Sequence, residues 1–197
     1  SFTQHMSTDG IDILWVIDPS GSMNDDKPQI LDGIADMMAV LPATGWRLAI
    51  ISSDYRWSET ENQFPLIPGD TAADAEAMYN SAVTGAFEAG FDAAYGYMMN
   101  NQYAQTWLRQ DAALLIVFVS DEDEQSNVYF NSTLQFQQWF SGVRQSSFIA
   151  SIINFDPSVS LCDHSSTLNT GHEYMDATNY FGGQIIDICD DDWSAGV

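Results

Sequence analysis

The chain has 197 residues, a length that suits one domain with a core of its own. Hydrophobic residues make up 45% of the chain and aromatic residues 13%, so the composition predicts a packed core and excludes a largely disordered protein. Acidic residues number 28 against 5 basic ones, and the net charge of −23 argues against nucleic acid or an anionic membrane as the partner.

The first half of the chain alternates between strand-like and helix-like segments. A short apolar run rich in β-formers predicts a buried strand over Ile11–Ile17. Apolar residues at helical spacing predict a helix from Pro28 to Leu41, which Pro42 ends. Further along, we expect a strand at Trp46–Ile51, a short edge strand at Phe64–Ile67 and a short helix from Ala72 to Ser81.

The second half continues the alternation. The almost unbroken apolar run Ala112–Val119 is typical of a central parallel strand. Around it we expect helices at Ala86–Met99, Ser132–Arg144 and His172–Tyr180, and strands at Phe148–Ile153 and Gln184–Ile188. Alternating strands and helices predict a doubly wound α/β domain, with a mostly parallel sheet and helices on both faces. Ligands of such sheets bind beyond the carboxyl ends of the strands.

Two polar turns follow predicted strands and fall at that edge. Asp18-Pro-Ser-Gly-Ser22 comes directly after the first strand, and Asp121 follows the central strand as part of an acidic run. Two serine hydroxyls and two carboxylates therefore converge on one point. Hard cations such as magnesium, manganese and calcium prefer oxygen ligands of this kind.

The segment Val16–Met23 resembles the metal-ion-dependent adhesion site (MIDAS) of von Willebrand factor type A (vWA) domains. The likeness extends to a bacterial exported or surface branch of that family through Trp107–Ala112, Val119–Ser126, Gly182-Gly183 and Ile188–Trp193. The resemblance implies a Rossmann-like vWA fold with a divalent cation, magnesium in the first place and manganese or calcium as alternatives.

It also implies the ligands of that cation. They are Ser20, Ser22 and a threonine from a middle loop, with Asp18 and Asp121 binding directly or through water. The threonine is where this sequence departs from the family pattern, because the expected position is Gly85. Its neighbour Thr84 is our candidate, and Glu88 is the alternative for the same site.

Other acidic and aromatic residues lie near these turns, and we do not expect them to bind the metal. We expect Glu122, Asp123 and Glu124 to form a solvated rim or a cap for the next helix, and Asp190–Asp192 to begin a final helix. Four aromatic residues are candidates for a contact rim near the metal: Tyr55, Trp57, Tyr129 and Phe130.

The two cysteines, Cys162 and Cys189, are either free thiols or one disulfide. The resemblance to exported proteins predicts the disulfide, because disulfides persist in oxidising compartments. No apolar run reaches transmembrane length, so we expect no membrane insertion. We expect residues 1–197 to be a single domain from a longer exported protein, with its final helix truncated, at the cell surface, outside the cell, in the periplasm or on a lipid anchor.

These features predict an adhesion domain and not an enzyme. The expected partner is a protein or surface ligand whose carboxylate completes the metal shell. One alternative is a structural module of a surface fibre or secretion assembly, in which the metal only braces loops. A metal-dependent hydrolase is a further alternative, although the metal turns contain no histidine and no Ser-His-Asp arrangement is evident.

Overall fold

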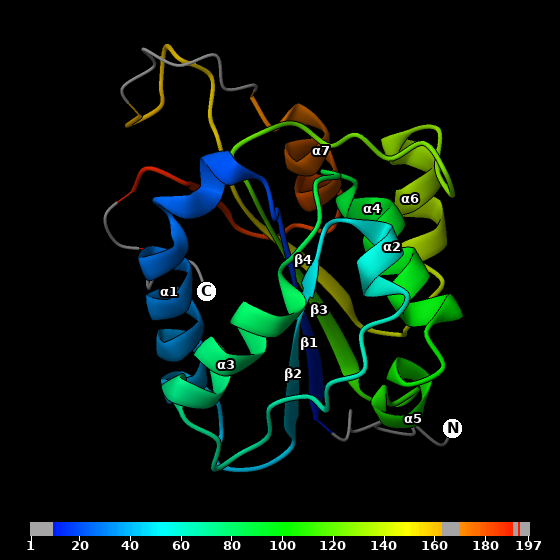
Figure 1. The fold of residues 1–197 in the computed structure, drawn as a ribbon. Coiled ribbons are helices and arrows are strands. Elements are labelled where there is room, and N and C mark those ends of the chain that lie inside the picture. The colour runs from blue at the N-terminus through cyan, green and yellow to red at the C-terminus, as the bar shows by residue number, and fades with distance from the viewer. Residues whose placement is uncertain (1–9, 163–169, 191–192, 194–197) are drawn as a thin grey trace, which may run out of the picture.

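The computed structural model of the protein describes residues 10–162, 170–190 and 193. Its centre is a five-stranded sheet in the order β2-β1-β3-β4-β5, in which every pair of neighbours is parallel. The strands are β1 (Ile11–Ile17), β2 (Trp46–Ser52), β3 (Ala113–Ser120), β4 (Ser147–Ile153) and β5 (Ile185–Asp187). The apolar run predicted as the central strand is β3, which lies between β1 and β4 (Figure 1).

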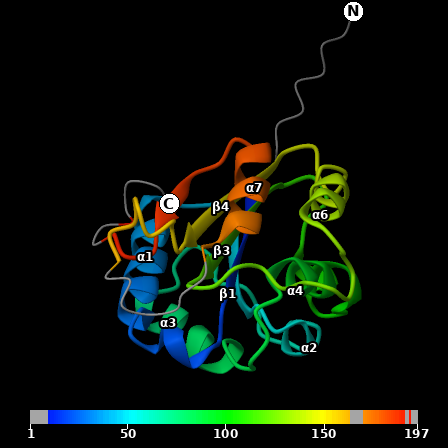
Figure 2. The ribbon, with the colours of Figure 1, turned by 90° about the horizontal axis from the view of Figure 1, so that it is seen from above.

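Helices cover both faces of this sheet (Figure 2). They are η1 (Gly21–Asn24), α1 (Lys27–Val40), α2 (Tyr55–Ser58), α3 (Ala72–Ala82), α4 (Gly90–Tyr95), η2 (Gly96–Asn100), α5 (Ala104–Trp107), α6 (Thr133–Phe140) and α7 (His172–Tyr180). On one face, α1 and α3 pack apolar side chains against β1 and β2, and on the other α4, α6 and α7 pack against β3 and β4. The predicted doubly wound α/β architecture is therefore confirmed.

The predicted helix over 86–99 is wrong at its start. Helix α4 begins only at Gly90, and η2, which is π-helical, follows it at Gly96–Asn100. Before Gly90 the chain is irregular, and the Ala89 N–H donates to the Ser53 carbonyl (3.3 Å) instead of joining a helix. A side chain at Gly90 would meet the Tyr174 hydroxyl at 2.6 Å, so the start of α4 packs directly on α7. Phe87 lies within the predicted helix, but in the structure it is half exposed in the preceding loop.

Two other boundaries differ from expectation. The edge strand expected at 64–67 is reduced to one antiparallel bridge between Leu48 and Leu66. The helix expected over 132–144 ends at Phe140 and continues only as a turn. The remaining predicted elements agree with the structure to within a few residues.

The disulfide between Cys162 and Cys189 is present, and it joins the loop after β4 to the residue that follows Ile188. Within the described residues, no helix has the length and apolar character needed to cross a membrane. The helix expected to begin at Asp190–Asp192 lies mostly outside the described residues, and Asp190 itself is not helical.

Candidate metal site

Asp18 is the most firmly placed residue of the candidate site. It follows β1 and is fully buried, and its backbone N–H donates to the Val119 carbonyl on the neighbouring strand β3 (2.9 Å). One of its carboxylate oxygens accepts the Ser20 N–H (2.7 Å), and the other accepts the Ser120 hydroxyl (2.7 Å). Both oxygens are thereby fixed at the carboxyl edge of the sheet.

The two serines of the same turn meet the acidic residue that follows β3. The hydroxyl oxygens of Ser20 and Ser22 lie 2.8 Å apart, and the Ser22 hydroxyl donates to Asp121 Oδ1 at 3.2 Å. Oxygens bound to one octahedral magnesium ion lie about 2.9 Å apart, because each Mg–O bond is about 2.0–2.1 Å. The spacing and the all-oxygen chemistry of Ser20, Ser22 and Asp121 therefore fit such an ion.

The carboxylates of this edge are crowded together. Burial raises the pKa of Asp18, with a smaller contribution from the charge of Glu122. Burial, together with the charges of Asp18 and Glu122, raises the pKa of Asp121 to about 6. Burial followed by the charge of Asp18 raises the pKa of Glu88 to about 8, and Glu122 and Asp121 add to the shift. A divalent cation at this edge would offset the repulsion and favour the charged forms.

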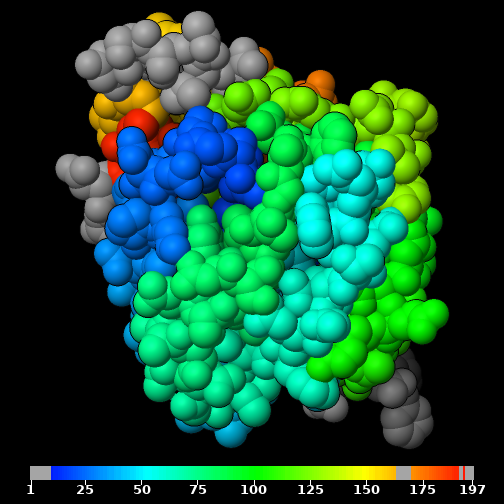
Figure 3. All heavy atoms as spheres, viewed as in Figure 1, coloured from blue at the N-terminus to red at the C-terminus, as the bar shows by residue number. Residues whose placement is uncertain are grey.

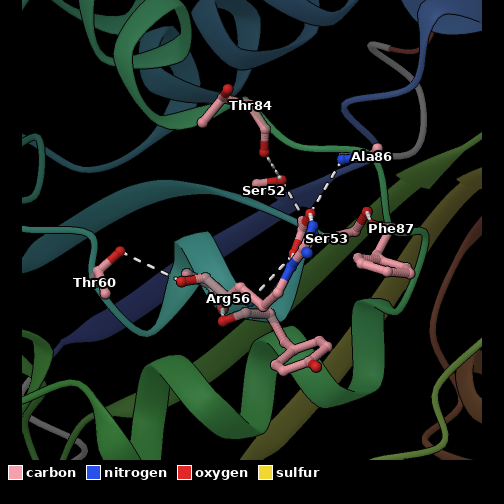
Figure 4. A network of polar contacts seen from close by, with 10 residues as sticks. Ser52, Ser53, Arg56, Thr60, Thr84, Ala86 and Phe87 are labelled. Carbon is pink, nitrogen blue, oxygen red and sulfur yellow. Dashed lines mark hydrogen bonds and ion pairs between the residues drawn. The ribbon is translucent and has the colours of Figure 1, made fainter.

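The middle loop contains both Thr84 and Glu88. The Ser52 hydroxyl donates to the Thr84 carbonyl (2.6 Å), and the Ala86 N–H donates to Asp54 (3.1 Å) (Figure 4). Gly85 has a φ of +117°, and a side chain there would meet Asp54 at 2.5 Å. The loop conformation therefore requires glycine at the position where the family pattern has a hydroxyl.

Thr84 and Glu88 are placed differently with respect to the serines. Thr84 is exposed, and its side chain points away from Ser52 in Figure 4. Glu88 is partly buried and is held by Gln125, whose backbone N–H donates to the Glu88 carbonyl (2.9 Å) and whose side-chain amide donates to its carboxylate. The charges of Asp18 and Asp121 contribute to the raised pKa of Glu88, so this residue lies within electrostatic reach of the site.

A second acidic group lies beside α4. Asp92 is fully buried and accepts the backbone N–H groups of four consecutive residues, Asn127 to Phe130, at 2.8–3.2 Å. Glu124 accepts the Phe91 N–H (3.0 Å) and the Ser126 N–H (2.8 Å), and also the Ser126 hydroxyl. The expectation that Glu124 belongs to a solvated rim or caps the next helix is therefore wrong, since it caps the start of α4, a helix much earlier in the chain.

The proposed aromatic rim is only partly exposed. Phe130 is 5% exposed and packs against Phe136 and Trp139, so it belongs to the core. Tyr129 is partly buried and its hydroxyl donates to Glu59. Of the four residues, Trp57 is the one that stands out from the surface, at 49% exposure.

No sequence pattern indicated that Asn154 lies close to this edge of the sheet. It is fully buried directly after β4, and neither its side-chain nitrogen nor its side-chain oxygen has a hydrogen-bond partner. Ser120 pairs with Ile153 in the sheet, so Asn154 follows β4 as Asp121 follows β3. An asparagine after a strand resembles an ordinary turn residue, which is why its sequence position carried no signal.

Another cluster with metal-ligating residue types is not a metal site. Cys162, Asp187 and Cys189 lie close together, but the two sulfur atoms form the disulfide. Asp187 accepts the backbone N–H of Leu161 (2.6 Å) and of Cys189 (3.1 Å). The carboxylate therefore braces the two ends of the disulfide.

Comparison with known proteins gives a structural likeness. No protein-family model matches the sequence, and no curated protein does. Among solved structures, proximal thread matrix protein 1 from the mussel byssus, with a zinc-occupied MIDAS motif, aligns over 95% of this chain at 13% identity and a TM-score of 0.61. A second crystal form of that protein aligns over 93% at 13% identity and a TM-score of 0.55. This chain covers 44% and 43% of those two chains, so it spans less than half their length. At this level of identity, the likeness establishes the fold.

Proposed function

We propose that this domain binds a divalent cation through Asp18, Ser20, Ser22 and Asp121 and uses that cation to bind a carboxylate of a protein or surface ligand. The observation that carries the proposal is the contact of Ser20 with Ser22 and of Ser22 with Asp121 at 2.8 and 3.2 Å. These residues lie in the turns after two adjacent strands, β1 and β3, and the two distances suit ligands of one ion.

The cation would supply a positive charge that stays electrophilic. The serine hydroxyls are neutral, so only Asp18 and Asp121 reduce the charge of a bound ion, and they reduce it less when they bind through water. An incoming carboxylate could then replace a water on the ion. Because the chain has a net charge of −23, acidic partners are repelled at long range, and attraction is concentrated at the site. This favours moderate affinity and attachment through many copies.

The fifth protein ligand comes from the middle loop in this proposal. Thr84 is the candidate that the family pattern favours, and Glu88 is the candidate that the electrostatics favour. Magnesium is the ion we expect first, with manganese and calcium as alternatives. The zinc in the mussel protein belongs to that protein and does not decide the choice for this one.

The likeness to a thread matrix protein also supports a second role. In that role the domain is a structural module of an extracellular assembly, and the cation only braces the loops. An extracellular or cell-surface location suits both roles, and the Cys162–Cys189 disulfide supports it. Neither role requires catalysis, so we propose a binding domain and not an enzyme.

Metal titration and adhesion together test the proposal. Calorimetry with magnesium, manganese and calcium should show one site, which Asp18→Ala abolishes. Adhesion of the purified domain to surfaces bearing carboxylates should then be lost with a chelator and in Ser20→Ala and Asp121→Ala. Metal binding with chelator-insensitive adhesion would favour the structural role. Undiminished metal binding by Asp18→Ala would show that the site is elsewhere.

A further inference from the structure

A polar cavity opens beside the candidate metal site. It has a volume of about 190 Å³ and lies between the turn after β1 and the C-terminal part of α3. Asp18 and Ser20 form one wall, and Lys27, Tyr79 and Asn80 form the opposite side. Figure 3 shows the surface hollowed between the blue η1 region and the green segment around α3. The metal site and the cavity therefore share residues.

Lys27 is the basic residue of this cavity. The chain has only five basic residues, and two of them, Arg56 and Arg109, are ion-paired with Asp54 and Asp12. Lys27 forms no ion pair with any described residue. Its ammonium group donates to Asn80 Oδ1 (2.5 Å) and lies 5.3 Å from the centre of the Tyr79 ring. These contacts hold the ammonium group at the cavity.

The contact with Asn80 also orients a second donor. Because the Asn80 carbonyl oxygen accepts from Lys27, the side-chain NH₂ group of Asn80 is left to donate to a ligand. The negative groups on this side are Asp18, whose oxygens are already engaged by Ser20 and Ser120, and Asp26, whose charge reaches Tyr79. A divalent cation and Lys27 together would offset these charges, so a second anionic group could enter.

We propose that the ligand of this domain carries two acidic groups on a short spacing, one bound by the cation and the other by Lys27 and Asn80 in this cavity. The inference rests on the proposed function, because the first acidic group needs the metal. The inference narrows the ligand to compounds with two acidic groups, because a single carboxylate would contact the cation and leave Lys27 and Asn80 unused. Lys27 is then the residue that distinguishes a paired acid from a single one.

The test compares two ligands of equal length on the magnesium-loaded domain. Succinate has two carboxylates, whereas succinamate has a carboxylate and a neutral amide. In calorimetric or NMR titrations with magnesium in excess, succinate should bind about fivefold more tightly, the effect of one partly exposed ion pair. Lys27→Met should remove that difference and Lys27→Arg should keep most of it. Arg144→Met is the matched control, because it removes the same charge after α6, outside this cavity.

The outcomes separate this proposal from the one on which it rests. Equal magnesium-dependent affinity for the two ligands, unchanged in Lys27→Met, would overturn the role of Lys27 and leave metal-dependent carboxylate binding intact. A lack of magnesium-dependent binding for either ligand would overturn both proposals. The comparison within the unaltered protein decides the matter even if Lys27→Met fails to fold.

Discussion

Two groups of buried carboxylates lie near the carboxyl edge of the sheet, and they differ in the kind of group that surrounds them. Asp92 and Glu124 accept mainly backbone N–H groups, and Asp92 alone accepts four. Asp18 accepts a single backbone N–H, and Asp121 is in contact with a serine hydroxyl. The first group faces fixed backbone N–H donors, whereas the second faces other oxygen atoms.

This difference separates a structural brace from a cation site. A carboxyl group surrounded by N–H donors has its hydrogen-bond partners within the fold and fixes the loop that supplies them. A carboxylate grouped with hydroxyls and other carboxylates is left with repulsion that a cation relieves. Acidic residues that look alike in the sequence therefore have different roles, and their hydrogen-bond partners show which is which.

The largest expected effect compares Asp92→Asn with Asp18→Asn in the absence of metal. Each oxygen of Asp92 accepts two N–H groups, so an amide NH₂ in either place would face two donors. We expect Asp92→Asn to lower the free energy of unfolding by about 3–5 kcal/mol. In Asp18→Asn the amide can accept from Ser20 and donate to the Ser120 hydroxyl, so we expect a loss under about 1 kcal/mol. Urea unfolding with chelator measures both, and equal losses would remove the distinction between the two groups.

The next largest expected effect on stability is the loss of the disulfide, which braces the fold without any charged group. It closes a loop between residues 27 positions apart, and the chain-entropy model gives a contribution of roughly 3–4 kcal/mol. We expect Cys162→Ser combined with Cys189→Ser to lower the free energy of unfolding by that amount while leaving magnesium affinity unchanged. Thermal unfolding and calorimetry measure the two quantities. A loss of metal affinity would show that the disulfide region supports the site.

Glu124 should give a smaller, pH-dependent effect. Burial raises its pKa to about 7, against a usual value of 4.5, while its hydrogen bonds oppose the shift. Because the folded pKa is the higher one, ionisation opposes folding. The stability contribution of the protonated group is complete below about pH 4.5 and is lost as the pH rises through 7. Between pH 4.5 and 8, ionisation of Glu124 should lower the free energy of unfolding by roughly 2–3 kcal/mol, and we expect Glu124→Gln to abolish this decrease. Unfolding across that pH range, with chelator, should show a flatter profile for the variant, and an identical profile would contradict the assignment.

The smallest effects concern the middle loop. The charges of Asp18 and Asp121 raise the pKa of Glu88, and a bound cation would favour its ionised form, so we expect Glu88→Gln to weaken magnesium binding about tenfold. Thr84 contacts Ser52 through its backbone carbonyl, which Thr84→Ala retains, so we expect a change within about twofold. Calorimetric titration of both variants decides between them, and the reverse order of effects would make Thr84 the ligand that the family pattern favours.

The strands and the first metal turn could be predicted from the sequence because their signals are local. The apolar runs of β1 and β3 and the turn Asp18–Ser22 need no knowledge of distant residues. The start of α4 could not be predicted, because Gly90 begins a helix against Tyr174, which is far away in the sequence. The 86–99 segment has helical spacing throughout, and contacts of Ala86 and Ala89 with Asp54 and Ser53 override it.

The roles of the acidic residues were harder to predict for the same reason. Glu124 and Asp121 belong to one acidic run, and only the packing of α4 against that run separates them. Asp92 lies within a predicted helix, and it accepts N–H groups from a loop that begins 35 residues later. Lys27 directly precedes the predicted helix from Pro28, and nothing local to it indicates a cavity that depends on α3.

The most direct test of the two kinds of carboxylate is the position of a bound ion. Crystals grown with manganese and measured at its absorption edge should show one anomalous peak, at about 2.2 Å from the hydroxyl oxygens of Ser20 and Ser22 and beside Asp18 and Asp121. No peak should lie at Asp92 or Glu124, whose oxygens are engaged by N–H groups. A single peak at Glu124, or none at the serines when manganese is saturating, would contradict the account.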